Sequence, residues 1–277
     1  MDSEQESSSE GRLVFTKEEW ETASVQITRE MTEYLARYRT PIFMDHGDHG
    51  EGWGSGSFIE VDRSKFILTN QHVATIRHSG QRLGFQMAGQ EKLILIQGHH
   101  VELGLPLDLA LLPVPEAGWT GLTHGASPLN LDKIAAAHSP VPTEILAFAG
   151  FAGKGTSFHF DTLFFKATTS VSREVPLPTD PRWDIRFHFG LDYRPDLATT
   201  VVGNDGLPDP RGLSGSAVWN TRFVEAKIRG IDWTPDLAQV TGVVWGWPSQ
   251  QGLLVATRAE HLRSFLQEAP AALATAT

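Results

Sequence analysis

The 277-residue chain contains no cysteine. That absence excludes disulfide bonds, thiol catalysis and cysteine-ligated zinc sites, and it favours a reducing compartment or simply a barrel of the bacterial kind. The sequence also has no run of about 18 apolar residues, so no membrane-spanning helix is predicted. Positive charge is scarce, with 23 Lys and Arg against 33 Asp and Glu and a net charge of −10. This balance does not favour nucleic acid as a partner.

The N-terminal residues are acidic and serine-rich, where a secretory signal would need positive charge followed by an apolar run. We therefore expect a cytoplasmic protein with a disordered N-terminus over residues 1–15. Thr16 and Glu19 then have the spacing of a capping box, and apolar residues recur at helical spacing from Trp20 to Tyr38. These features predict an N-terminal helix within residues 16–41, ended by Pro41 and packed outside the remaining domains.

Short apolar runs separated by turn residues make up most of the remaining chain, a pattern typical of all-β proteins. We expect a first β-barrel over residues 42–120 and a second over residues 143–257. A Gly-, Pro- and Ser-rich linker over residues 121–142 would connect them. Residues 258–277 are predicted to form a closing helix and a tail.

Three separated segments each place one polar group beside an apolar strand: Ile67 to Val73 with His72, Pro106 to Leu112 with Asp108, and Arg211 to Val218 with Ser214. A base, an acid and a hydroxyl nucleophile occur in the order His, Asp, Ser. Chymotrypsin-type proteins use this order, whereas subtilisins and α/β-hydrolases use others.

On these motifs the chain resembles the trypsin-like, chymotrypsin-fold serine proteases. The run Thr69-Asn70-Gln71-His72-Val73 and the run Asp108-Leu109-Ala110-Leu111 are similar to the HtrA type, without an obvious PDZ module. The resemblance implies an all-β fold of two six-stranded antiparallel β-barrels, here with an N-terminal and a C-terminal helix. It places His72 and Asp108 in the first barrel and Ser214 in the second.

The chemistry that this resemblance implies is peptide-bond hydrolysis through an acyl-enzyme. His72 would act as general base, Asp108 would orient its ring, and Ser214 would be the nucleophile. Gly212 and Gly215 bracket Ser214, so we prefer Ser214 to Ser216. Since an oxyanion needs backbone donors that no Cβ obstructs, the amides of Gly212 and Ser214 are the candidate oxyanion hole.

By analogy with the family, the substrate pocket would be lined by residues before Ser214 and by the strand around Trp245. The candidates are Leu207, Pro208, Val244, Trp245 and Gly246. No acidic residue is clearly placed at the base of this pocket, which favours an apolar side chain before the cleaved bond. Leu213 stands where digestive enzymes carry an activating Asp. Control by loop ordering, by an activating protein partner or by oligomerisation is therefore favoured over cleavage of the N-terminus.

Two other functions remain open. A pseudo-protease could use the same barrels as a binding or scaffold module, and a small-molecule esterase or amidase could use the same machinery. Metal-ligand residue types gather at Asp45 to Glu51 and at His99-His100. We interpret both groups as solvated loops and predict no metal and no cofactor. The expected partners are a protein or peptide substrate and an activating protein.

Overall fold

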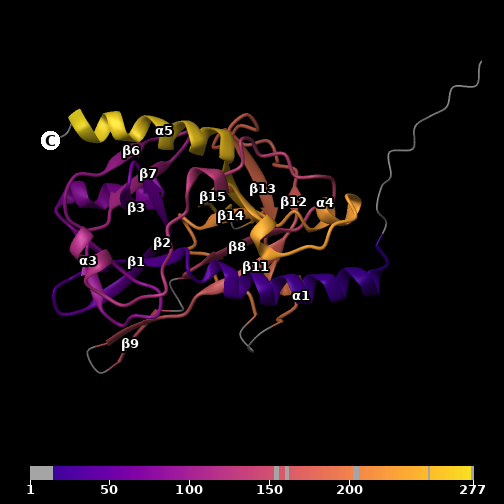
Figure 1. Ribbon diagram of the computed structural model, residues 1–277, viewed down its shortest axis with the longest axis horizontal. Coiled ribbons are helices and arrows are strands. Elements are labelled where there is room, and N and C mark those ends of the chain that lie inside the picture. Colours follow the sequence, from indigo (N-terminus) through magenta and orange to yellow (C-terminus); the bar gives the residue numbers. More distant parts are fainter. Residues whose placement is uncertain (1–14, 153–155, 160–161, 202–205, 249, 276–277) are drawn as a thin grey trace, which may run out of the picture.

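Two seven-stranded antiparallel sheets make up most of the computed structural model (Figure 1), which describes residues 15–152, 156–159, 162–201, 206–248 and 250–275. The expected disordered segment therefore lies almost entirely outside the described residues. Within them, each sheet has seven strands rather than the six expected.

The first sheet has the strand order β5-β4-β1-β2-β3-β7-β6. Its strands are β1 (Arg39–Asp45), β2 (Gly50–Val61), β3 (Ser64–Thr69), β4 (Arg82–Gln86), β5 (Leu93–Leu95), β6 (Val101–Leu103) and β7 (Leu109–Pro113). Between β3 and β4 lie the short helix α2 (Gln71–Ala74) and the 3₁₀ helix η1 (Thr75–Ser79). The 12-residue strand β2 is the longest of this sheet and borders the second half of the molecule.

The second sheet has the order β11-β8-β14-β15-β16-β13-β12. Its strands are β8 (Leu146–Gly150), β11 (Thr168–Ser172), β12 (Glu174–Val175), β13 (His188–Asp192), β14 (Ala217–Asn220), β15 (Gln239–Gly246) and β16 (Leu253–Arg258). A separate hairpin is formed by β9 (Thr156–His159) and β10 (Thr162–Phe165). Short helices α3 (Glu116–Thr120), η2 (Leu131–Lys133), η4 (Pro195–Leu197), α4 (Phe223–Ile228) and η5 (Pro235–Leu237) occupy the connections.

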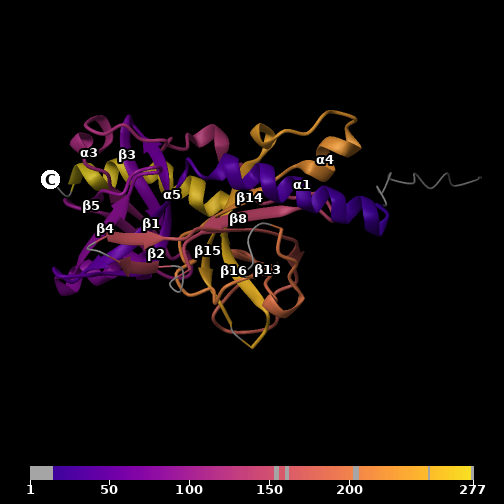
Figure 2. The same cartoon turned by 90° about the horizontal axis from the view of Figure 1, so that it is seen from below.

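Helix α1 (Lys17–Leu35) begins at the predicted capping box, where the Glu19 amide donates to Thr16 Oγ1 at 3.2 Å. Ala23, Ile27 and Met31 form its buried face, as the four-residue spacing predicts. It packs along the second sheet, beside β8 and β11 (Figure 1) and next to β8 in the turned view (Figure 2). The predicted end was wrong: the helix stops at Leu35, and Pro41 lies inside β1. Pro41 is compatible with a strand because its ring fixes φ at a value that an extended chain can adopt. Its only cost to the sheet is the backbone N–H that proline lacks.

Helix α5 (Ala259–Thr275) closes the chain and contacts strands of both sheets, β15 and β16 in one and β2, β6 and β7 in the other. Figure 1 shows it lying across the top of the molecule. Its buried side chains Leu262, Phe265 and Leu266 enter the same core as Ile27 and Met31. One continuous core therefore fixes the two sheets relative to each other. No helix in the described ranges is long and apolar enough to cross a membrane.

Candidate active site

His72 lies in the one-turn helix α2, directly after β3. The chain turns helical at Gln71, so His72 lies just beyond the end of the strand. Asn70, the residue before this helix, is fully buried, and its side-chain amide donates to the carbonyl of Asp108 at 2.8 Å. The loop that carries His72 is thereby tied to the loop that carries Asp108.

The His72 and Asp108 side chains form a two-point contact. Nδ1 of His72 lies 2.6 Å from Oδ2 of Asp108, and the His72 backbone amide donates to Oδ1 at 2.9 Å. Because a carboxylate only accepts, Nδ1 carries the proton, and Nε2 of the neutral ring keeps its lone pair. The Asp108 side chain is 3% exposed and that of His72 is 47% exposed. This arrangement can present His72 Nε2 at the surface as a proton acceptor, with the buried carboxylate of Asp108 behind the ring.

The backbone that presents Asp108 is held by three side chains. Asn70 donates to the carbonyl of Asp108, Thr257 Oγ1 to that of Leu107 at 2.8 Å, and His188 Nε2 to that of Pro106 at 2.7 Å. Asp108 has a φ of 49°, in the left-handed region that Asp tolerates better than most residues. Thr257 and His188 belong to the second sheet, so both halves of the molecule position this acid.

Ser214 lies in a tight turn between two glycines with positive φ, 94° at Gly212 and 90° at Gly215. A Cβ at Gly215 would come within 2.0 Å of the Ser55 carbonyl oxygen, so this position requires glycine. The turn is held from inside by bonds from the Leu213 amide to the Pro210 carbonyl and from the Ser216 amide to the Leu213 carbonyl.

Strand β2 brings the Ser214 turn and the His72 helix together. The Ser55 amide donates to the carbonyl of Ser214 at 2.8 Å, and the indole nitrogen of Trp53 donates to the carbonyl of Val73 at 3.1 Å. At Gly54, between them, a Cβ would lie 3.0 Å from Val73 and 3.5 Å from the Ser214 carbonyl oxygen. The residue after His72 and the carbonyl of Ser214 thus flank the same glycine.

The Ser55 hydroxyl makes a further pair of bonds to the second half. It donates to the carbonyl of Gly212 at 2.7 Å and accepts from the amide of Phe151 at 2.8 Å. Fixing the Gly212 carbonyl also fixes the orientation of the peptide that follows it. Among the described residues, the amides of Gly212 and Ser214 donate to no backbone carbonyl. Those are the two donors expected for an oxyanion.

Within the described ranges, no hydrogen bond joins His72 Nε2 to the Ser214 hydroxyl. Such bonds are often long in unliganded proteins and shorten when substrate binds. His72 and Asp108 are thus in direct contact, and the backbone of the Ser214 turn lies against Gly54, next to the helix that carries His72.

Some of the predicted pocket residues belong to the hydrophobic core of the second sheet, and others lie at its edge. Val244 is buried, and its amide and carbonyl bond to Ser216 and Gly215. Leu207 packs on the outside of the same cluster, and the Pro208 carbonyl accepts from the Tyr193 hydroxyl at 2.6 Å. Trp245 packs instead against a separate cluster of Trp183, Leu253 and Val255, while Gly246 pairs with Val255 in the sheet. Burial raises the pKa of the Tyr193 hydroxyl, so it stays protonated and donating.

Sequence reasoning missed Ser55, His188, Thr257 and Tyr193. Each acts through a bond to a backbone carbonyl more than ten residues away, and such bonds have no sequence signature. Only Ser55 had a signal: it lies between two glycines in a buried strand, where glycines indicate the close approach of another backbone.

No protein-family model and no curated protein matches the sequence. The structure resembles the Rv3671c protease from M. tuberculosis in its active form, with 18% identity, a TM-score of 0.51, and coverage of 88% of this chain and 86% of that chain. The serine protease domain of the Sesbania mosaic virus polyprotein is less similar, at 15% identity, a TM-score of 0.45 and coverage of 83% and 92%. The MamO protease domain from Magnetospirillum magneticum has 11% identity and a TM-score of 0.46, with coverage of 82% and 94%. The chain has the chymotrypsin-like serine-protease fold, as predicted.

Proposed function

We propose that this protein is a serine endopeptidase that cleaves peptide bonds through an acyl-enzyme. The observation that carries the proposal is the 2.6 Å contact between His72 Nδ1 and Asp108 Oδ2, which leaves Nε2 as the proton acceptor. Ser214 is the nucleophile: its hydroxyl proton passes to Nε2 as its oxygen attacks the carbonyl carbon of the substrate. His72 then returns this proton to the leaving amine, and water releases the acyl group by the same route.

Asp108 contributes orientation and charge. It holds the Nδ1–H tautomer and stabilises the imidazolium that forms during attack, without becoming protonated itself. The negative charge that develops on the substrate oxygen is met by the amides of Gly212 and Ser214. In serine proteases the loss of one such donor costs about 3 to 4 kcal/mol of transition-state stabilisation.

The residues near the Ser214 turn favour a substrate with an apolar side chain immediately before the cleaved bond. Asp209, the acidic residue nearest the predicted pocket, is paired with Arg211, whose Nε donates to its carboxylate at 3.0 Å. Its charge is thus already neutralised. Leu207 and Trp247, by contrast, offer apolar surface at the edge of the core. We extend the proposal to a protein or peptide substrate, a cytoplasmic site of action and an activating partner; the HtrA-type resemblance rests on the motifs alone.

Labelling by a fluorophosphonate probe tests the assembled nucleophile. Folded wild type should react, Ser214→Ala should not, and Ser216→Ala should still react because Ser216 is fully buried. Cleavage of a peptide library would then separate an endopeptidase from an esterase that turns over small esters only. No reaction of the folded wild type, with or without candidate activators, would contradict the proposal and favour a binding module.

A further inference from the structure

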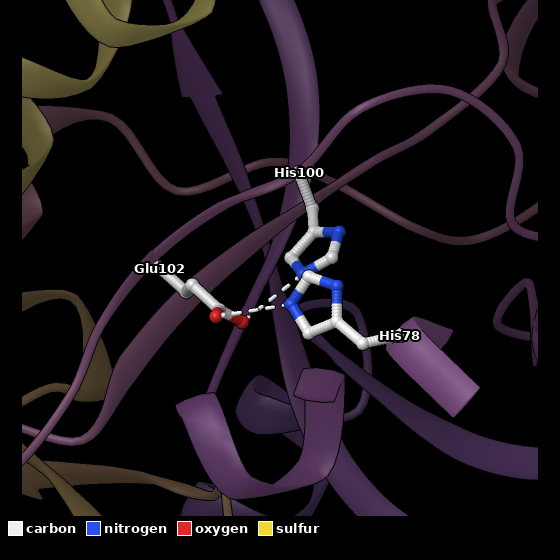
Figure 3. A group of neighbouring side chains, drawn as sticks. All are labelled: His78, His100 and Glu102. Carbon is white, nitrogen blue, oxygen red and sulfur yellow. Dashed lines mark hydrogen bonds and ion pairs between the residues drawn. The ribbon is translucent and has the colours of Figure 1, made fainter. Parts of the chain in front are cut away.

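Three side chains converge on one point away from the Ser214 turn (Figure 3). Nε2 of His78 lies 3.1 Å from Glu102 Oε1, and Nε2 of His100 lies 3.0 Å from Glu102 Oε2. The ligand-capable atoms of the three residues all lie within 4.8 Å of one another. His78 comes from η1, Glu102 from β6, and His100 immediately precedes β6.

The local backbone explains this convergence. His100 and Glu102 are two residues apart in an extended segment, so their side chains project to the same side. His99 is exposed and is not part of the cluster. His78 faces this pair from the adjacent 3₁₀ helix, with its ring centroid 5.2 Å from that of His100. The interpretation of His99-His100 as an ordinary polar loop overlooked this cluster, because His78 is distant in sequence from His100 and Glu102.

The donor set suits a borderline transition metal. Imidazole nitrogens bind zinc at about 2.0–2.1 Å and a carboxylate oxygen at about 2.0–2.2 Å. Tetrahedral ligands at those lengths are about 3.3 Å apart, so no separation in the cluster need close by more than roughly 1.5 Å. The His78 side chain is 59% exposed and free to make that movement, whereas His100 is 9% exposed and fixed.

We propose that His78, His100 and Glu102 form a binding site for a divalent transition-metal ion of the zinc class, held by Nε2 of both rings and one carboxylate oxygen. The fourth position is open to water or an external ligand, because a surface hollow of about 370 Å³ borders both histidines. Calcium and magnesium are excluded as occupants, since they prefer sets made of oxygen atoms.

Arg77 opposes this ion and lowers its affinity. Its Nη1 lies 3.0 Å from Nδ1 of His100 and must donate, so Nδ1 accepts and Nε2 carries the proton in the metal-free protein. Metal at Nε2 transfers the ring proton to Nδ1, where it meets the Arg77 donor. Arg77 must then turn away, keeping its bond to the carbonyl of Gly98 at 2.8 Å. The site is therefore adjustable rather than preformed.

The ion links the two segments that lead to the acid–base pair. Helix η1 continues directly from α2, which carries His72, and β6 leads into the loop that ends at Asp108. Crosslinking η1 to β6 should therefore stabilise the first sheet around that pair. Because the ion binds only the folded chain, the unfolding temperature should rise with the logarithm of the zinc concentration once that concentration exceeds the dissociation constant.

Zinc titration of the full chain by calorimetry, with thermal unfolding in parallel, tests the site without reference to hydrolysis. Wild type should bind one Zn²⁺ and gain several degrees in unfolding temperature. His78→Ala and Glu102→Gln should each weaken binding at least tenfold. His99→Ala is the matched control and should bind like wild type; Ca²⁺ should not bind. Absence of zinc binding at 100 μM, roughly the weakest useful affinity for such a site, or equal loss in His99→Ala, would overturn the proposal.

Arg77→Met provides a second, independent test. Removing the donor that faces His100 Nδ1 should tighten zinc binding severalfold, an effect opposite to that of removing a ligand. Unchanged or weaker binding in this variant, measured with folded protein, would exclude His100 Nε2 as a ligand and overturn the proposed site.

Discussion

The hydroxyl of Ser55, in the first sheet, donates to the carbonyl of Gly212, in the turn of Ser214, at 2.7 Å. The same oxygen accepts from the amide of Phe151, just beyond β8. One fully buried hydroxyl therefore joins β2 to two segments of the second half. Because it holds the Gly212–Leu213 peptide, which lies between the two candidate donor amides, we infer that Ser55 is a positioning residue for the candidate oxyanion hole.

Ser55→Ala should slow reaction with a fluorophosphonate probe by roughly tenfold or more, since loss of this bond frees the Gly212–Leu213 peptide, which links the two candidate oxyanion donors. Substrate affinity should change little, so an ester assay should show a lower kcat at similar KM. Ser57→Ala is the matched control, two residues along the same buried strand. Equal losses in the two variants would mean that packing of β2, rather than the Gly212 bond, is responsible.

Asp108→Asn should reduce hydrolysis by about 10⁴-fold, the scale seen when a serine protease loses this carboxylate. An amide cannot accept equally well from Nδ1 and from the His72 backbone amide, so the reactive tautomer is lost. Asp62→Asn is a close control because Asp62 also has a positive φ, 47°, but is exposed in a hairpin. Steady-state kinetics on both variants measures the effect. Activity of Asp108→Asn near that of Asp62→Asn would remove Asp108 from the mechanism.

Gly215→Ala should lower the free energy of unfolding by more than about 3 kcal/mol, because the new Cβ meets backbone that cannot move. It would lie 2.0 Å from the Ser55 carbonyl oxygen and 2.4 Å from Thr69 Oγ1. Gly89→Ala measures the cost of a positive φ without a steric clash. Gly89 also has a positive φ, 77°, but a Cβ there would have open space around it. It should lose only about 1 kcal/mol. Chemical denaturation measures both, and similar losses would refute the steric argument.

The sequence predicted the elements whose information is local. The capping box and four-residue apolar spacing located α1, and two of the motifs contain His72 and Asp108, which are in contact in the structure. The missed features depend on tertiary contact. Helix α2 has only four residues and no side-chain cap, so periodicity could not reveal it.

Dependence on tertiary contact also explains why the residues that hold the Asp108 loop were not predicted. The Asp108 loop is held by His188 and Thr257, which lie 82 and 150 residues from their bonded carbonyls. A histidine or threonine inside a strand has no local pattern that indicates which carbonyl it will reach. Only the packing of the second sheet against the first determines that partner.

His188 makes stability depend on pH in a direction that can be tested. Burial lowers the pKa of its ring below the ordinary value of about 6.5. Its two nitrogens are both used: Nδ1 accepts from the Asp184 amide at 3.0 Å, and Nε2 donates to the Pro106 carbonyl. Above pH 6.5 the ring is neutral in both the folded and unfolded chains, so it adds no pH dependence there. As pH falls below 6.5, the unfolded chain binds a proton that the folded chain resists, and unfolding becomes easier.

His188→Gln should remove that dependence, because glutamine can still donate to the Pro106 carbonyl but does not titrate. Urea denaturation at several pH values between about 5 and 8 gives the difference in unfolding free energy between wild type and variant. That difference should be constant near neutral pH. On acidification, the unfolding free energy of wild type should fall relative to that of the variant. His261→Gln is the control, since His261 likewise donates to a carbonyl, that of Arg186, but lies at the surface. If the difference did not change with pH, His188 would protonate as readily in the folded protein as in the unfolded chain. The bond from its Nε2 to the Pro106 carbonyl would then not depend on a neutral ring.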